Sequence, residues 1–311
     1  NLSVLATGVL TLGDITTTDT AGFTAAGAIT QTTTSMLNLG GTSSMVVGTD
    51  DAITLTQSNN VFGGVLTLDA KSSDIVATGA LSIAGTLGSD GLRVTGDGAI
   101  SFGTLSTGAD LWVDTAGNIS QTGTLTVSGV TTLAAGTTGD ITLAQSGNEF
   151  GALVTLVSGD DVTLSDASDL TLSGASTGNL NVTTGDVLTL GTLTTGGDLV
   201  LSAAGAITQE NATDVLTISG TTTLTAADTN GTYDITFANV SDTDVSLNEF
   251  LGAVTIVNAA DVALRDRDAL TIGITASGDA NLFAENTLFL GQSNVDGDLR
   301  ARGNFTLSGD I

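Results

Sequence analysis

The sequence predicts an all-β fold, a right-handed parallel β-helix in which the chain winds into stacked coils. Three observations predict it: the composition favours strands, short apolar segments alternate with polar residues, and one long pattern recurs along the chain. Together they argue against helices and against an ordinary globular core.

The composition is skewed toward small, strand-forming residues. Charged residues make up 13% of the chain and hydrophobic residues 41%, with 41 Gly and no Pro. Proline cannot donate to a β-ladder, so its absence indicates unbroken sheet. The chain also has no Cys and no His, which excludes disulfides, thiolate or imidazole metal sites and every catalytic scheme that uses these side chains.

The charge balance restricts the partners. Six Lys and Arg stand against 33 Asp and Glu, giving a net charge of -27, which repels nucleic acid and attracts divalent cations. No apolar run is long enough to span a bilayer, and no basic and apolar leader opens the chain. We therefore expect a processed piece of a longer protein, with no nucleic-acid partner and no membrane span.

A long repeat covers almost the whole chain. Residues 8–31 (GVLTLGDITTTDTAGFTAAGAITQ) correspond without a gap to residues 98–121 and 186–209. A second marker, Asn-x-Phe, occurs at Asn60, Asn148 and Asn248. We interpret residues 1–311 as a single continuous β-solenoid with super-repeats at approximately 8–97, 98–185 and 186–286, followed by the start of a fourth at 287–311.

Within one super-repeat, apolar residues alternate with small polar residues, as in strands. The clearest pairs are Ile100/Phe102, Leu111/Val113, Leu125/Val127, Ile141/Leu143, Val154/Leu156, Val162/Leu164, Leu170/Leu172 and Leu180/Val182. With weaker segments added, about 12 strands fit one unit, which predicts three short strands per coil and about 22 residues per coil. At a coil spacing of about 4.8 Å, about 14 coils would form a rod of about 67 Å.

A sandwich of hairpins would bury the same alternation and is the structural alternative. It prefers two-residue Asn-Gly or Asp-Gly turns, and only Asp90-Gly91, Asp97-Gly98 and Asn230-Gly231 provide them. The right hand follows from the general hand of parallel crossovers.

Residues 139–156 (GDITLAQSGNEFGALVTL), 161–174 (DVTLSDASDLTLSG) and 197–209 (GDLVLSAAGAITQ) resemble filamentous-haemagglutinin-type exoproteins. The resemblance rests on repeat style and composition over almost the whole chain. It implies the β-helical shaft of a very large surface protein, secreted through an outer-membrane partner and serving in adhesion, biofilm or contact-dependent competition.

The largest departure from the repeat is an insertion after Leu224. It contains Asp228, Asp234, Asp242 and Asp244 with the only tyrosine, Tyr233. Insertions on solenoids often form binding faces, so a ligand or calcium role is one interpretation. A longer surface loop is the other, because loops tolerate insertion at little cost in free energy.

Two further sets of acidic residues recur one copy apart. They are Asp160, Asp161, Asp166 and Asp169, then Asp261, Asp266 and Asp268. They could form the paired acids of a glycosidase or a polysaccharide lyase, but such sites also need cations. Arg265 and Arg267 occur in one copy only, where the other has Ser165 and Ala167. Turns at coil corners, with each carboxylate capping backbone groups, are the structural interpretation.

The Asn-x-Phe marker predicts a buried aromatic beside an asparagine ladder, on one face every four coils, rather than a recognition site. Threonine runs such as 221–223 suggest ice binding, which uneven coils disfavour.

These observations predict a non-enzymatic structural rod of a secreted bacterial adhesin or extracellular filament, supporting adhesion, biofilm or matrix formation. We assign no catalytic, cofactor-binding or metal-ligating residue, and expect no cofactor beyond weakly bound calcium. The expected partners are the chain itself, by end-to-end or lateral assembly, host or matrix glycans or surface receptors, and an outer-membrane transporter during secretion. The expected location is extracellular or at the surface of a Gram-negative-type bacterium, and the alternative is a β-helix protein that binds or cleaves carbohydrate.

Overall fold

The computed structural model describes residues 1–229, 231–237 and 248–307, and these contain strands and no helix. The chain divides into two compact units, Asn1–Asp160 and Asp161–Ile311. Nowhere in the described part is there a helix that could span a membrane.

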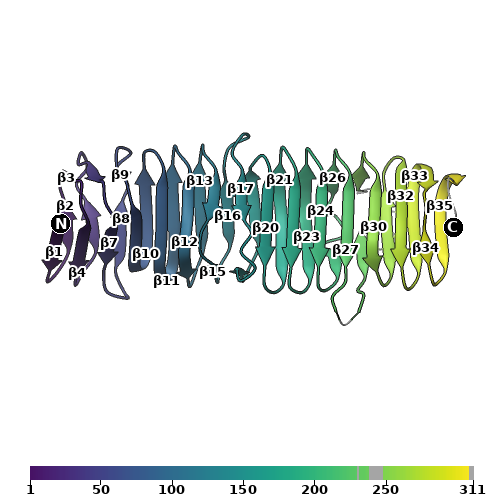
Figure 1. Ribbon diagram of the computed structural model, residues 1–311, viewed down its shortest axis with the longest axis horizontal. Helices are drawn as coiled ribbons and strands as arrows, with labels where there is room; N and C mark the ends of the chain where they lie inside the picture. The colour runs from purple at the N-terminus through teal and green to yellow at the C-terminus, as the bar shows by residue number, and fades with distance from the viewer. Residues whose placement is uncertain (230, 238–247, 308–311) are drawn as a thin grey trace. The chain divides into compact units, whose positions relative to one another are not determined.

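The first unit is built mostly from short strands that lie side by side (Figure 1). They are β1 (Leu2–Ala6), β2 (Leu10–Leu12), β3 (Ile15–Thr17), β4 (Ala21–Ala25), β5 (Ile29–Gln31), β6 (Leu37–Leu39), β7 (Ser43–Val46), β8 (Ala52–Leu55), β9 (Val61–Phe62), β10 (Val65–Ala77), β11 (Leu81–Gly96), β12 (Ile100–Thr107), β13 (Leu111–Thr115), β14 (Ile119–Gln121), β15 (Leu125–Val127), β16 (Thr131–Ala134), β17 (Ile141–Leu143), β18 (Glu149–Phe150) and β19 (Val154–Ser158).

The second unit repeats this plan. Its strands are β20 (Val162–Asp166), β21 (Leu170–Ser176), β22 (Leu180–Thr184), β23 (Leu188–Thr195), β24 (Leu199–Ala203), β25 (Ile207–Gln209), β26 (Leu216–Ile218), β27 (Thr222–Ala226), β28 (Ile235–Phe237), β29 (Glu249–Phe250), β30 (Val254–Ala259), β31 (Val262–Asp266), β32 (Leu270–Ala276), β33 (Ala280–Leu290), β34 (Asn294–Val295) and β35 (Leu299–Leu307).

Each unit is a parallel β-solenoid. In the first, Leu2 pairs with Ala21, Ala21 with Ser43 and Ser43 with Leu66, always with the strands parallel. In the second, Leu180 pairs in the same way with Leu199. The predicted parallel β-helix is confirmed and the hairpin sandwich is wrong, whereas the right hand of the coil stays a prediction.

The coils are shorter than predicted, with about 19 residues per turn rather than about 22. Thr131 pairs with Val154, 23 residues on, but Val65 pairs with Ser82, only 17 residues on. The prediction was too long because it treated every apolar segment as one strand separated from the next by a turn. In β10 and β11 the chain passes from one sheet to the next without leaving extended structure.

The interior of each unit is a stack of aliphatic side chains. Every residue of the eight predicted apolar pairs, from Ile100 to Val182, is buried. The alternate residues face outward, where Thr11 and Thr30 on adjacent coils share a hydrogen bond of 3.3 Å between their hydroxyls. The burial of all the predicted pairs confirms the predicted core. Burying apolar area in this way is the main favourable contribution to folding.

The sequence repeat shifts by one sheet between copies in the first unit. Strand β4 belongs to the ladder of β7 and the first half of β10. Its counterpart one copy later, β13, instead belongs to the ladder that contains β8 and the second half of β10. A small separate sheet, β3–β6–β9, holds Phe62, whereas Phe150 in β18 pairs with β15. The Asn-x-Phe markers therefore do not return to one face, and our prediction that they would is wrong.

Candidate functional site

The predicted acidic residues at the coil corners hold the backbone of the neighbouring coil. One oxygen of Asp161 accepts a hydrogen bond from the backbone N–H of Asn179 at 2.8 Å, and Asp169 accepts one from Val187 at 3.0 Å. Asp160 belongs to the first unit, where its own N–H donates to the carbonyl of Gly139. For Asp161 and Asp169 the prediction that the carboxylate caps backbone groups is confirmed, and the groups they cap lie one coil away.

Asp166 and Asp266 differ from the corner residues because both side chains are buried. Asp166 accepts from the backbone N–H and the hydroxyl of Ser168. Asp266 accepts from the backbone N–H groups of Phe250 and Asp268, at 2.8 and 2.7 Å. Burial raises the pKa of Asp266, and these two hydrogen bonds oppose the rise. Each carboxylate thus closes a turn inside the wall.

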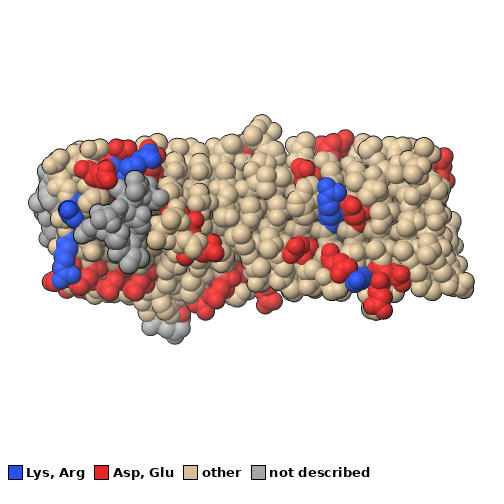
Figure 2. Space-filling model, turned by 180° about the vertical axis from the view of Figure 1, so that it is seen from behind, with Lys and Arg blue, Asp and Glu red and all other residues tan. Residues whose placement is uncertain are grey.

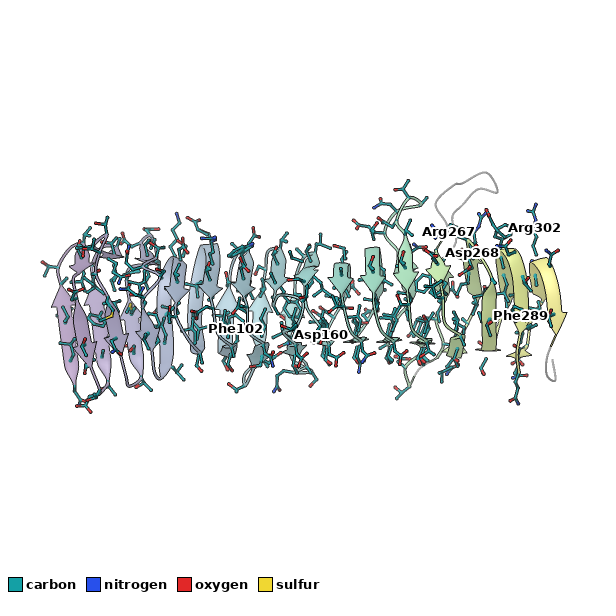
Figure 3. The ribbon with its side chains drawn as sticks, turned by 90° about the horizontal axis from the view of Figure 1, so that it is seen from above. Phe102, Asp160, Arg267, Asp268, Phe289 and Arg302 are labelled. Atoms are coloured by element: carbon teal, nitrogen blue, oxygen red, sulfur yellow. The ribbon has the colours of Figure 1, made fainter. Side chains whose placement is uncertain are left out.

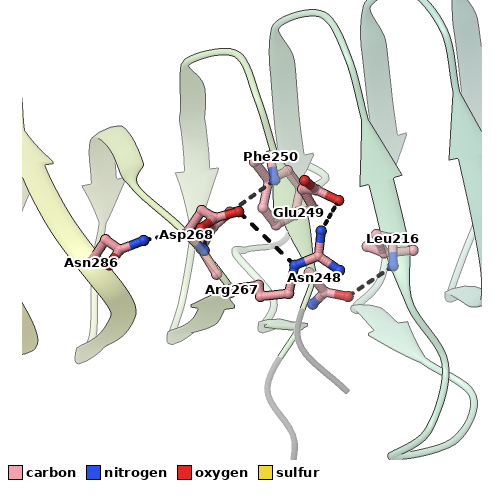
Figure 4. A network of polar contacts seen from close by, with 8 residues as sticks. Leu216, Asn248, Glu249, Phe250, Arg267, Asp268 and Asn286 are labelled. Atoms are coloured by element: carbon pink, nitrogen blue, oxygen red, sulfur yellow. Dashed lines mark hydrogen bonds and ion pairs between the residues drawn. The ribbon is translucent and has the colours of Figure 1, made fainter. Parts of the chain in front are cut away.

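The two arginines of the third copy contact residues of neighbouring coils. Arg265 is only 9% exposed, and its guanidinium lies 4.8 Å from the ring centroid of Phe283 on the next coil. Arg267 pairs with Glu249, and beside it Asp268 accepts a hydrogen bond from Asn286 at 3.0 Å (Figure 4). Figure 3 shows Arg267 and Asp268 together at the edge of the strands. These contacts join neighbouring coils.

The second unit also has a column of corner aspartates. The N–H of Asp261 donates to Asp234, that of Asp279 to Asp261, and that of Asp298 to Asp279, at 3.1, 2.7 and 2.8 Å. Arg300 lies beside two of them, 2.8 Å from Asp298 and 4.0 Å from Asp279. Within the described ranges, no group of three or more acidic side chains could hold a metal ion.

The first described residues of the insertion after Leu224 contact one another. Asp228 accepts the N–H of Gly231 at 3.0 Å, and Ala227 forms an antiparallel bridge with Thr232. The negative charge of Asp228 raises the pKa of Tyr233. Asp242 and Asp244 lie outside the described residues, so the predicted ligand or calcium role of this segment stays a prediction.

The Asn-x-Phe marker forms a buried amide pair rather than an asparagine ladder. Asn148 is 0% exposed and exchanges two hydrogen bonds with Gln121, at 2.8 and 2.9 Å. Its oxygen also accepts the N–H of Leu125 and its nitrogen donates to the carbonyl of Leu143.

The same pair recurs in the other copies, as Asn60 with Gln31 and Asn248 with Gln209. The phenylalanines that follow, Phe62, Phe150 and Phe250, are buried as predicted. The sequence marked both partners, because the glutamines close the other repeated segment. It did not indicate that they meet.

Our sequence reasoning also missed a group on the outer face of the first unit. The only tryptophan, Trp112, lies under the guanidinium of Arg93, which is 4.3 Å from its ring centroid. Arg93 also pairs with Asp74 at 3.6 Å. These residues line a cavity of about 240 Å³ together with Ser72, Asp90, Asp110 and others. Elsewhere the lysines and arginines are few and most stand beside acidic residues, as one face of the molecule shows (Figure 2).

The comparisons with known proteins give one family. A family model described as repeats of unknown function (DUF5649) matches residues 1–69, 88–157 and 177–257. The three matches together cover more than half of the chain and start at intervals close to those of the repeated glutamines. No curated protein and no solved structure matches the sequence.

Proposed function

The chain belongs to the DUF5649 family of repeats of unknown function, and from this premise we propose that it is a structural rod of a secreted bacterial surface adhesin or extracellular filament. The rod would support adhesion, biofilm or matrix formation. Its place is extracellular or at the cell surface of a Gram-negative-type bacterium, and an outer-membrane transporter would be its partner during secretion. The resemblance to filamentous-haemagglutinin-type exoproteins supports these finer points.

One observation carries the proposal: the polar side chains described above, whether they recur or occur in one copy, hold coil to coil. The carboxylate of Asp161 binds the backbone of the next coil, Asn148 binds two backbone groups and a glutamine, and Arg267 pairs across a coil. Solenoids of this kind are stabilised by contacts between neighbouring repeats. Side chains arranged in this way hold neighbouring coils together and make the stack rigid.

Small-angle X-ray scattering of the purified chain tests the proposed rod. A continuous stack is expected to give the scattering of a rigid rod of about 67 Å or somewhat more, because each coil adds about 4.8 Å. A compact or hinged particle would contradict it. Electron microscopy then separates a single shaft from end-to-end or lateral assembly, because exposed coil ends can pair with further strands.

The proposed rod carries out no catalytic step. A polysaccharide lyase or glycosidase would need acids free to reach a glycan, whereas Asp161, Asp166 and Asp169 accept hydrogen bonds from the protein itself. A depolymerisation screen over acidic and neutral polysaccharides tests this point. Cleavage that disappears in an Asp161→Asn variant would replace the rod with a carbohydrate-cleaving enzyme.

A further inference from the structure

We propose that the cavity beside Trp112 binds one neutral sugar unit of a glycan. This inference goes beyond the structural role and depends only on the geometry of the first unit. It starts from a rank of outward-facing residues that occupy matching positions on successive coils. In order along the stack they are Thr11, Thr30, Thr54, Asp74, Arg93, Trp112, Thr132 and Thr155.

Three consecutive members of this rank depart from threonine. Asp74, Arg93 and Trp112 replace it, and they contact one another, through an ion pair of 3.6 Å and a guanidinium 4.3 Å from the indole centroid. The repeat does not require them, since the residues that correspond to Trp112 in the other copies are Gly22 and Val200. A solenoid wall needs only small polar residues at these outward positions, so these three side chains, which also join neighbouring coils, are larger than the repeat requires.

The hollow beside the rank has a simple cause. Two residues earlier on each strand lie Ala52, Ser72 and Gly91, which pair with one another on three successive coils. Of the three, Ser72 lines the cavity, and its small side chain leaves space next to the larger ones. Gly91 has φ +82°, and a Cβ there would collide with the carbonyl oxygen of Asp110. A side chain at Gly91 would therefore be strained, so this position beside the rank stays small.

The chemistry of the lining fits a sugar. The guanidinium of Arg93 covers one face of the indole and holds it in place. The part of the indole that lines the cavity offers apolar surface for the C–H face of a pyranose ring. Asp74, Asp90 and Asp110 line the cavity. Asp110 accepts the N–H of Val130 and Asp90 the hydroxyl of Ser89, but hydrogen bonding to a sugar hydroxyl, unlike catalysis, needs only a remaining lone pair on a carboxylate. At about 240 Å³ the cavity is smaller than the roughly 300–1,000 Å³ of most ligand pockets. It suits one ring of a longer glycan that continues over the surface.

The charge of the lining decides between classes of glycan. Three carboxylates and one guanidinium line the cavity, and Lys71 outside it pairs with Asp90 at 2.9 Å. This excess of negative charge disfavours uronic and sialic acids. The expected ligand is therefore a neutral hexose or an N-acetylhexosamine.

Titration of the intrinsic fluorescence tests the site directly, because the chain has one tryptophan. The probes are cellotetraose, laminaritetraose, chitotetraose and tetragalacturonate. We expect a saturable change with at least one of the three neutral probes and a weaker response, or none, with tetragalacturonate. Absence of a response to all neutral probes at millimolar concentration would overturn the proposal, and so would preference for tetragalacturonate.

Calorimetry on variants assigns the binding to this cavity. Trp112→Ala is expected to weaken binding at least about tenfold, as aromatic anchors commonly do. Val200→Ala changes the corresponding position one copy later and should leave the affinity unchanged. Equal binding by Trp112→Ala and the unaltered chain would refute the site, and circular dichroism melts check that both variants fold. The scattering test of the rod is independent, so the two proposals can fail separately.

Discussion

At the scale of single residues, the core of each unit contains polar side chains whose hydrogen bonds are made inside the protein. Asn148 is the clearest case, since its amide oxygen and nitrogen each bind one backbone group and one atom of Gln121. A buried polar group costs free energy when it lacks a partner, and much less when it is fully paired. The amide pair therefore fixes the register of the coils that it joins.

Replacing Asn148 with alanine should destabilise the first unit. The change removes the partner that Asn148 gives to the N–H of Leu125, the carbonyl of Leu143 and the amide oxygen of Gln121, whereas the amide nitrogen of Gln121 keeps the carbonyl of Gly123. We expect a loss of about 3 to 5 kcal/mol in the free energy of unfolding, measured by urea denaturation. The control is Asn118→Ala, at an exposed corner where the side chain accepts one backbone N–H. A loss no larger than that of the control would show that the pair contributes little.

Asp266 gives a prediction about pH. Burial raises its pKa in the folded state above the ordinary 3.8. As pH rises from 3.8 toward the folded pKa, the unfolded chain loses this proton first, so this group's contribution to stability falls. Asp266→Asn does not titrate and keeps an oxygen for one of the two N–H groups. The melting temperature of the variant minus that of the unaltered chain should increase between about pH 3 and pH 7. A difference that stays flat or decreases would contradict the assignment.

The sequence indicated which residues depart from the general pattern, but it did not indicate which groups they bind. The Asn-x-Phe marker and the repeated glutamines were both visible, yet their pairing depends on coil length, because the partners are 27 to 39 residues apart. Trp112 stood out only by its residue type. Its contact with Arg93 follows from the register between coils, which composition and periodicity do not give.

At the scale of elements, strand positions follow from the alternation of apolar and polar residues, whereas the joins between strands do not. Strand β11 runs through a change of register near Gly85, which has φ +137°. Strand β21 does the same near Gly174, with φ +118°. With 41 glycines in the chain, the sequence does not show which of them carry such a bend. This is why the predicted coil was too long.

Gly85→Ala tests the importance of this bend. A Cβ at Gly85 would collide with the carbonyl oxygen of Leu68, in a backbone conformation that alanine disfavours. We expect a loss of about 2 to 4 kcal/mol in the free energy of unfolding. Gly136→Asn is the matched control. Gly136 also has positive φ, at +67°, but a Cβ there would meet no other atom within 4 Å, and asparagine tolerates this region. If the two variants were equally stable, the backbone around position 85 would have moved to relieve the contact between the new Cβ and the carbonyl oxygen of Leu68 at little cost in free energy.

At the scale of the whole molecule, the composition decides the class of fold and the charge decides how the chain responds to salt. With a net charge of -27, repulsion between carboxylates opposes the folded state. Several corner aspartates use one oxygen to accept a backbone N–H, as Asp261 and Asp279 do. Such a carboxylate has fewer free oxygens with which to bind a cation. Its negative charge can still be screened by dissolved salt.

We therefore predict that sodium chloride raises the melting temperature and that calcium adds little beyond its ionic strength. Raising the salt concentration from about 0.01 M to about 0.15 M shortens the screening length from about 30 Å to about 8 Å, which weakens repulsion between exposed carboxylates on neighbouring coils. Scanning calorimetry in sodium chloride, in calcium chloride at matched ionic strength and after treatment with chelator measures the separate effects. A melting temperature that falls on chelation at constant ionic strength would instead place bound calcium between the acidic corners, because only a specifically held ion stabilises at low free concentration.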